Sequence, residues 1–451
     1  MVEAKRARWT NWAGNQSAAP LQIHRPRTEE ELVAVVRRAA ERGERVKAVG
    51  SGHSFTSIAL TDGHLVDLAE YNRLIESTTD HRLELPDAVR SPDTGRHFVT
   101  VQSGIRLKEL NPQLWDLGYS MTNLGDVAYQ SISGAIATAT HGTGKDVGGL
   151  ATQVVGLRVI TGDGEIIECS LDREPELFQA ARVGIGAAGL ISAVTLEVES
   201  AFNLRAQEIL MPIGDLLDEM DGYLEDNEHF EFFWFPGSDN ALTKRNNRTT
   251  DAAEPQPRWR EFVTDEIVGH RYMANATRLL NVPGVRLKLR SLLEGARGEY
   301  VERSYKVFTS ERKIPFYEME YFIPSEHARE AFERVRALIA RSGYGVVMPI
   351  EMRWVAPDDI PLSTAHGRPT TSIAVHMLKH QEFQPYFEAV ETIMADYDGR
   401  PHWGKLHFHT HRSLAPLYPQ WDAYQSARAR LDGRGTFANE YTDRVLGAVG
   451  G

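Results

Sequence analysis

Residues 131–144 read SISGAIATATHGTG, a run that contains no aspartate, glutamate, lysine or arginine and consists mostly of small side chains. Such a run forms a weak helix in water and is also a poor strand. Its composition indicates a segment that packs closely against a flat surface or lets backbone amides approach a ligand. Taken by itself, the run fits close packing without a ligand equally well.

A second glycine-rich stretch, VGSGHSF at 49–55, follows the predicted strand RVKAVG at 45–50. Glycines at such a turn let backbone N–H groups converge on an anion, as a phosphate-binding loop requires. The stretch lacks the G-x-G-x-x-G spacing that opens a helix, so it does not predict an NAD-type nucleotide site. A tight turn with a hydrogen-bonded His53 explains it equally well.

Strands and helices alternate around these two stretches. Residues 30–42 place apolar side chains at helical spacing behind an acidic start, which predicts an amphipathic helix. Residues 154–170 contain two alternating strands joined by a Gly-Asp-Gly turn at 162–164, which predicts a hairpin. A long predicted strand ends near Ser200, and the chain then becomes richer in aromatic residues. The pattern is typical of an α/β or α+β domain that ends near residue 200.

Length and composition narrow the class of protein. The chain has 451 residues, of which 42% are hydrophobic, and its 50 Lys and Arg against 62 Asp and Glu give a net charge of −12. This length predicts at least two domains, and the composition is that of a folded chain. The negative charge argues against nucleic acid as the main partner, because phosphate binding needs a basic surface.

Cysteine content and apolar runs indicate the compartment. The single cysteine, Cys169, excludes an internal disulfide and a thiolate metal cluster. No apolar run reaches the length of a membrane span, and the first residues show no secretory signal. The sequence therefore predicts a cytoplasmic protein without an integral membrane segment.

Four motifs together identify a family. GSGHSF, SGAIATATHGTG, VVGLRVITGDGEI and the late HWGK at 402–405 resemble the aldonolactone oxidoreductases, a branch of the vanillyl-alcohol-oxidase type of FAD flavoproteins. The resemblance runs from NWAGN at 11–15 to FANEYTDRVL at 437–446 and is closest to the bacterial L-gulono-1,4-lactone oxidase/dehydrogenase group. It implies an α+β fold with two domains, in which an antiparallel-sheet cap domain covers an FAD-binding domain. The cap would be 201–400, and 401–451 would return to the FAD-binding domain, 1–200.

The resemblance also assigns residues to the cofactor. The loop Ala48–Ser54 would bind the FAD pyrophosphate, and His53 matches a histidine that many family members bond covalently to the flavin. Small side chains in the second run would let its backbone approach the flavin and phosphates. The residues implied at FAD are Ala48, Val49, Gly50, Ser51, Gly52, His53, Ser54, Gly125, Ser131, Ile136, Ala139, Thr140, His141, Gly142, Thr143, Ile191, His402 and Lys405.

The pair Glu351 and Arg353 lies in the apolar stretch around PIEMRWV. On a strand, residues i and i+2 face the same side, so the two side chains would project together. A surface ion pair is the alternative, but the apolar flanks favour a buried pair. In the family this pair lies at the substrate. Arg353 would stabilise negative charge on the substrate oxygen, and Glu351 would orient the Arg353 side chain. The family pattern also places Lys405, His376 and Ser131 at the substrate, with Lys405 and His376 counted as catalytic.

The histidines His407, His409 and His411 alternate, so on a strand they would share a face and could build a metal site. A metal-dependent enzyme acting on sugars is therefore the alternative from another class. It leaves both glycine-rich stretches unexplained, and we expect no metal.

The implied reaction is oxidation of an aldono-1,4-lactone, such as L-gulono- or D-arabinono-1,4-lactone, at carbon 2 with hydride transfer to flavin N5. Dioxygen or another acceptor would reoxidise the flavin, and Gly125 would leave space for dioxygen. An alditol or sugar oxidase is the alternative within the family. Leu378 replaces a threonine of the alditol-oxidising relatives and tilts the prediction towards a cyclic lactone.

Overall fold

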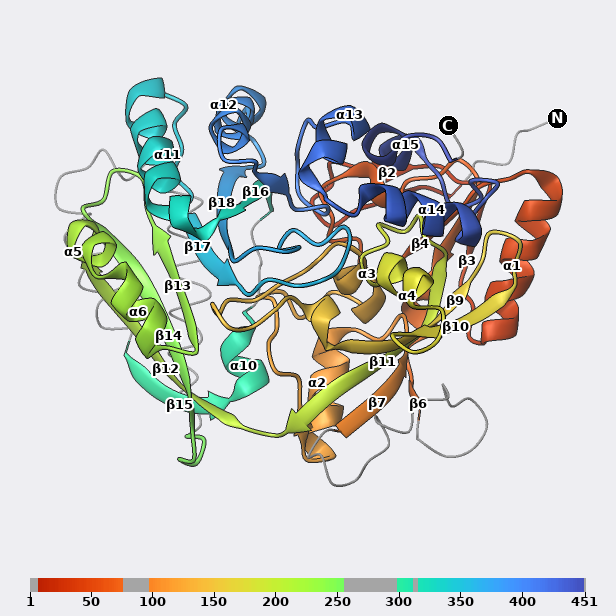
Figure 1. Ribbon diagram of the computed structural model, residues 1–451, viewed down its shortest axis with the longest axis horizontal. Coiled ribbons are helices and arrows are strands. Elements are labelled where there is room, and N and C mark those ends of the chain that lie inside the picture. Colours follow the sequence, from red (N-terminus) through yellow and green to blue (C-terminus); the bar gives the residue numbers. More distant parts are fainter. Residues whose placement is uncertain (1–6, 76–96, 255–297, 311–314, 450–451) are drawn as a thin grey trace.

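The computed structural model describes residues 7–75, 97–254, 298–310 and 315–449 (Figure 1). Helices and largely antiparallel sheets are both present, as the α+β prediction requires. No helix among the described residues is long and apolar enough to cross a membrane.

The first glycine-rich loop follows a small parallel sheet. Its strands are ordered β3 (Gln22–His24), β5 (His64–Asp67) and β4 (Val46–Val49). The predicted amphipathic helix is α1 (Glu29–Arg42), which begins at a Thr28 cap and buries its apolar side against this sheet. Because β4 ends at Val49, the loop that follows emerges at the end of a strand fixed by burial.

A second, antiparallel sheet contains the predicted hairpin. Its strand order is β10-β9-β11-β7-β6, and β8 pairs with β11 outside this order. The turn between β9 and β10 falls at the Gly-Asp-Gly site, and a long strand ends at Ser200, as predicted. The strands are β6 (Leu74–Ile75), β7 (His97–Gln102), β8 (Tyr119–Ser120), β9 (Val154–Ile160), β10 (Ile166–Ser170) and β11 (Leu190–Ser200).

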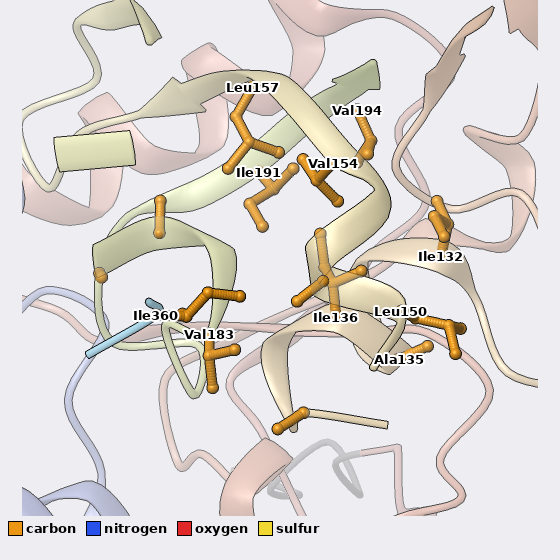
Figure 2. Close-up of a cluster of buried hydrophobic side chains, with 14 of the residues drawn as sticks. Ile132, Ala135, Ile136, Leu150, Val154, Leu157, Val183, Ile191, Val194 and Ile360 are labelled. Atoms are coloured by element: carbon orange, nitrogen blue, oxygen red, sulfur yellow. The ribbon is translucent and has the colours of Figure 1, made fainter. Parts of the chain in front are cut away.

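Three helices pack with the antiparallel sheet around one apolar core. They are α2 (Leu107–Asp116), α3 (Ile132–Ala137) and α4 (Pro175–Arg182). Figure 2 shows Ile136 of α3 among the sheet residues Val154, Leu157 and Ile191. The apolar side chains of α3 are therefore core residues, and small neighbours let the helix lie close to the sheet.

The largest sheet has eight strands in the order β15-β12-β14-β13-β17-β18-β16-β19. One face carries an apolar cluster covered by helices α5 (Ile213–Asp218), α6 (Met220–Asp226), α11 (Ala328–Ser342) and α12 (Gln384–Ala395) (Figure 1). The strands are β12 (Asn203–Pro212), β13 (His229–Trp234), β14 (Asn240–Thr249), β15 (Glu299–Arg303), β16 (Phe316–Pro324), β17 (Ile350–Val355), β18 (Thr370–Leu378) and β19 (Arg400–Pro401).

The last part of the chain first pairs with β16 of the eight-stranded sheet, at residues 400–406, and then packs against the first half of the chain. Helix α14 (Trp421–Leu431) contacts α4, and Trp403 and Tyr441 join the core of the antiparallel sheet. Lys47 of β4 donates from its ammonium nitrogen to the carbonyls of Gly186 (2.8 Å) and Phe437 (3.0 Å). Burial lowers the pKa of Lys47 to about 7. The remaining helices are α10 (Ser304–Phe308), α13 (His411–Leu414) and α15 (Glu440–Leu446).

Candidate active site

The second face of the eight-stranded sheet carries ionisable side chains although its strands are buried. Residues directly opposite each other in an antiparallel pair share a face. Glu231 of β13 lies opposite Arg353 of β17, and Glu318 of β16 lies opposite His376 of β18. All four are less than 10% exposed. Because side chains alternate along each strand, the apolar residues face the helices and the charged residues face the other side of the sheet.

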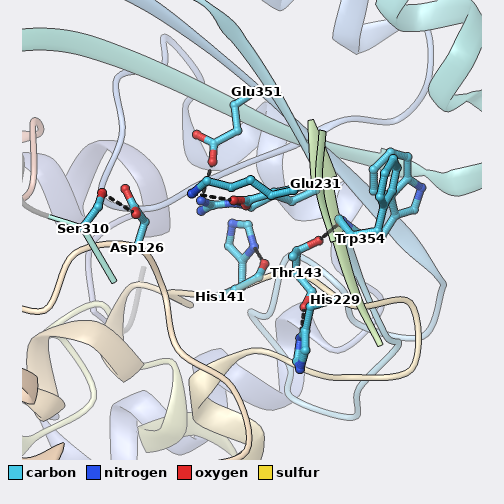
Figure 3. Close-up of polar contacts among 12 residues, drawn as sticks. Asp126, His141, Thr143, His229, Glu231, Ser310, Glu351 and Trp354 are labelled. Carbon is cyan, nitrogen blue, oxygen red and sulfur yellow. Dashed lines mark hydrogen bonds and ion pairs between the residues drawn. The ribbon is translucent and has the colours of Figure 1, made fainter. Parts of the chain in front are cut away.

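Arg353 lies between two carboxylates. Its Nε donates to Glu231 Oε2 at 2.5 Å, and its Nη2 forms an ion pair with Glu351, as predicted from the i, i+2 spacing (Figure 3). Burial alone lowers the pKa of Arg353, but Glu231 and Glu351 raise it well above its usual range. The guanidinium is therefore a permanent buried cation. Glu231 was not predicted as a site residue. The feature that could have indicated it is a lone glutamate in the aromatic strand HFEFFW.

Lys405 and His376 meet at a second carboxylate that the sequence analysis also missed. Lys405 Nζ forms an ion pair with Glu318 Oε2, and His376 Nε2 lies 3.5 Å from Glu318 Oε1. The other ring nitrogen of His376, Nδ1, donates to the Pro349 carbonyl at 2.8 Å. Burial on its own raises the pKa of Glu318, but Lys405 and His376 lower it to about 2. Glu318 is thus an ionised group at neutral pH.

A third buried polar cluster consists of His141, Glu320 and His402, which come from three distant parts of the chain. His141 Nδ1 faces the Gly142 carbonyl at 2.8 Å, and its Nε2 faces Glu320 Oε1 at 2.9 Å. Both ring nitrogens therefore face acceptors. Burial lowers the pKa of His402 to about 3, and His402 Nδ1 accepts from the Gly404 N–H at 3.0 Å, so its proton lies on Nε2.

His141, Glu320 and His402 are also close enough to share a metal ion, with ligand atoms within 4.8 Å of one another. Coordination through His402 Nε2 would require its proton to move to Nδ1 and the bond from Gly404 to break. Glu320 is already bonded to His141. The hydrogen-bond pattern favours a polar contact between chain segments over a metal site.

The alternative in which His407, His409 and His411 share one strand face does not hold. Between β19, which ends at Pro401, and α13, which begins at His411, the described chain has no strand. His407 bonds Tyr441 Oη at 3.0 Å, and His409 bonds Ser413 Oγ at 2.9 Å. The segment crosses from the sheet to the C-terminal helices, so period-two alternation does not apply to it.

The first glycine-rich loop packs on the start of α3. Ser131 caps α3 by accepting from the Gly134 N–H at 3.3 Å, and a Cβ on Gly50 would lie 1.9 Å from the Ser131 hydroxyl. A side chain at position 50 would therefore displace the Ser131 side chain that caps the helix. Ser51 Oγ is shielded from solvent and has no hydrogen-bond partner among the described residues.

His53 lies in this loop among aromatic rings. Its ring stacks on Trp12 with centroids 5.5 Å apart and lies 6.3 Å from Tyr129. Burial, followed by the charges of Lys405 and Arg106, lowers the pKa of His53 to about 4. The imidazole is consequently neutral at physiological pH.

The second half of the small-residue run packs flat against the eight-stranded sheet. The Thr143 hydroxyl donates to the Phe230 carbonyl and accepts from the Trp354 N–H at 3.2 Å (Figure 3). A Cβ on Gly125 would lie 2.8 Å from Thr140 Cγ2 and 3.0 Å from the His141 carbonyl oxygen. Close packing, one of the two interpretations of this run, therefore accounts for Gly125 and for the end of the run.

A cleft lies between the first loop, the small-residue run and the polar sheet face. It brings His53, Ser54, His402 and Lys405 together, as predicted, but Glu351, Arg353 and His376 do not line it. Ile136 and Ile191 lie in the core (Figure 2). The residues that line the cleft are Trp12, His53, Ser54, Phe55, Val127, Gln130, Thr138, Phe316, Glu318, His402, Gly404 and Lys405.

These surroundings fit FAD. Aromatic side chains from Trp12, Phe55 and Phe316 offer flat apolar walls, as a flavin ring requires. The loop adds glycines, a shielded hydroxyl at Ser51 without a partner and a neutral histidine. The cleft thus provides ring-binding walls beside a loop suited to phosphate.

Comparisons with known proteins cover nearly the whole chain. Residues 194–445 match the D-arabinono-1,4-lactone oxidase family, and residues 20–170 match the FAD binding domain family. L-gulono-1,4-lactone dehydrogenase of Mycobacterium tuberculosis is 44% identical over 97% of this chain and 99% of its own. L-gulonolactone oxidase of Bos taurus is 32% identical over 98% and 99%. The crystal structure of the cholesterol oxidase of B. sterolicum has a similar fold, with a TM-score of 0.79 at 15% identity over 97% and 96% of the two chains.

Proposed function

Because this chain belongs to the D-arabinono-1,4-lactone oxidase family of FAD-dependent oxidoreductases, we propose that it oxidises an aldono-1,4-lactone, such as L-gulono-1,4-lactone, at carbon 2. The observation that carries the proposal is the cleft that places His53 of the first loop opposite Glu318 and Lys405 of the polar side. We further propose that residues 1–200 and 401–451 hold the cofactor and residues 201–400 cap the substrate.

The residues of the chain divide the work as follows. FAD, when bound, supplies the two-electron oxidant for the carbon that bears the hydroxyl. The N–H groups of residues 50–54 would hold its pyrophosphate, and His53 would be the point of covalent attachment to the flavin. Lys405, whose charge Glu318 balances, donates a hydrogen bond to the substrate hydroxyl. Arg353 lies outside the lining of the cleft but on the same sheet face as Glu318, and its guanidinium acts at longer range on negative charge that develops on the substrate oxygen. Glu351 holds Arg353 in place through their ion pair.

The function is tested on the purified holoprotein. We expect flavin absorption near about 450 nm, and its bleaching when L-gulono-1,4-lactone is added without oxygen. An alditol such as sorbitol is the matched control; Leu378 lies behind the cleft wall with Phe55 and Phe316 and offers no hydrogen bond to an open chain. A protein that lacks flavin, or one that sorbitol bleaches faster than the lactone, would contradict the proposal.

Dioxygen is the acceptor that we propose for the reduced protein, and Gly125 is the position that tests it. Hydrogen peroxide should form with the lactone in air. Gly125→Ala should slow reoxidation more than reduction in stopped-flow measurements, because its Cβ would displace Thr140 and His141 of the small-residue run, which the proposal places beside the flavin. Gly214→Ala, where a Cβ meets no atom within 4 Å, is the control. Fast reduction without reoxidation in oxygenated buffer would indicate a dehydrogenase that needs another acceptor.

A further inference from the structure

The cleft contains one compensated pair of charges. Among the described residues that line it, Glu318 and Lys405 are the ones ionised at neutral pH, since the pKa values of His53 and His402 are lowered to about 4 and about 3. These two residues form an ion pair with each other. Their side chains are 8% and 21% exposed. The lining of the cleft therefore contains two charged groups but has no net charge.

Glu318 is held in this position from three sides. The register of the sheet sets it opposite His376, whose Nε2 lies 3.5 Å from its carboxylate. The Glu318 carbonyl accepts from the Leu406 N–H at 2.9 Å, which fixes the neighbouring residue of Lys405 to the same strand. Lys405 also lies 5.4 Å from the centroid of the Phe55 ring. The carboxylate and the ammonium are thus kept together by the backbone as well as by their charges.

A ligand that carries a carboxylate meets an unfavourable site here. A buried anion is stable only beside a cation whose charge is not already balanced. In this cleft the charge of the Lys405 ammonium is balanced by Glu318. Glu320, a second buried carboxylate on the same strand, pairs with His141 and does not line the cleft. An uncharged ligand with several hydroxyls pays no such penalty and can hydrogen-bond both partners of the pair.

We propose that Glu318 is a specificity-determining residue: by neutralising Lys405, it makes the cleft accept the uncharged lactone and exclude the aldonate anion that forms when the lactone ring hydrolyses. The inference rests on the proposed lactone oxidation. Ring opening converts a neutral ester into a carboxylate with the same carbon skeleton and hydroxyls. Discrimination between the two forms therefore depends on charge, which a single residue can set.

The test compares sodium L-gulonate with L-gulono-1,4-lactone on the holoenzyme. The dissociation constant of gulonate is read from the perturbation of the flavin spectrum without turnover, and the KM of the lactone from steady-state rates. In the unmodified protein we expect the dissociation constant of gulonate to be at least about 100-fold larger than the KM of the lactone. Equal affinities for the two forms would overturn the inference without any variant.

Glu318→Gln keeps the shape of the side chain and leaves Lys405 uncompensated. We expect the ratio of the gulonate dissociation constant to the lactone KM to fall at least about tenfold in this variant. A role confined to folding would not change the ratio of the two constants. An unchanged ratio in a folded, flavin-loaded Glu318→Gln protein would contradict the inference.

Two further variants isolate the charge. Glu318→Gln combined with Lys405→Met should lose the gain in gulonate affinity, because the unpaired cation is gone. Glu320→Gln removes a carboxylate from the same strand and sheet face that pairs with His141 instead, and its ratio should stay that of the unmodified protein. A gain that persists in the double variant, or appears in Glu320→Gln, would overturn the inference. Failure of the lactone to reduce the flavin would instead refute the proposed function.

Discussion

Arg353→Ala is expected to lower kcat/KM for the lactone by about 10²–10³, the usual loss for a preorganised group that stabilises developing charge. The variant should also lose stability by about 3–5 kcal/mol, because removing one partner of a buried ion pair leaves the others uncompensated. Here two carboxylates, Glu231 and Glu351, would be left without their shared cation. Steady-state kinetics and thermal melting of the holoprotein measure the two effects.

Arg353→Lys separates the catalytic part of this effect from the structural part. Lysine keeps the positive charge between the carboxylates, but it cannot donate from two separate guanidinium nitrogens. We expect a melting temperature closer to that of the unmodified protein and a kcat/KM that is still well below it. Normal kinetics in Arg353→Ala, or full recovery of activity in Arg353→Lys, would show that Arg353 serves the fold and not the reaction.

His53→Ala is expected to convert all covalently bound flavin into flavin that acid releases. The prediction rests on a neutral imidazole in the glycine-rich loop, stacked on Trp12 at the wall of the cleft. A ring with a free lone pair at neutral pH is the nucleophilic form of histidine. After acid precipitation, the yellow colour should stay in the pellet of the unmodified protein and move to the supernatant for the variant.

His402→Ala is the matched control for this experiment. His402 is a second neutral histidine at the wall of the same cleft, outside the loop, and its replacement should leave the colour in the pellet. Colour in the supernatant of the unmodified protein would exclude a covalent bond. Colour that remains with the His53→Ala pellet would place the attachment at another residue.

Local patterns predicted those parts of the site that depend on neighbours in sequence. The strand before the first loop, the hairpin at 162–164 and the common side of Glu351 and Arg353 all follow from periods of two or from turn chemistry, and the structure shows them. The alternation of His407, His409 and His411 has the same period. It failed as a strand signal because the segment forms no sheet ladder.

The partners of the predicted residues were not predictable in this way. Glu231, Glu318 and Glu320 lie on strands far in sequence from the residues that they bind. Glu231 was visible as a single acidic residue within an aromatic strand, and Glu318 and Glu320 as two acidic residues within another. Such a pattern indicates burial but names no partner. Strand order decides which residues become neighbours, and β16 is placed between β18 and β19 rather than beside β15.

The sequence by itself determined the family, the FAD cofactor class and the two glycine-rich segments. Backbone freedom and small side chains are properties of the individual residues in a segment, so they can be recognised without the tertiary structure. Only the tertiary structure decided that His141 pairs with Glu320 and that Lys405 is neutralised by Glu318. Those pairings depend on the register and packing of segments more than 80 residues apart. Buried charges are stable only when such packing supplies a partner, so the charge of the cleft is a property of the fold and not of any one segment.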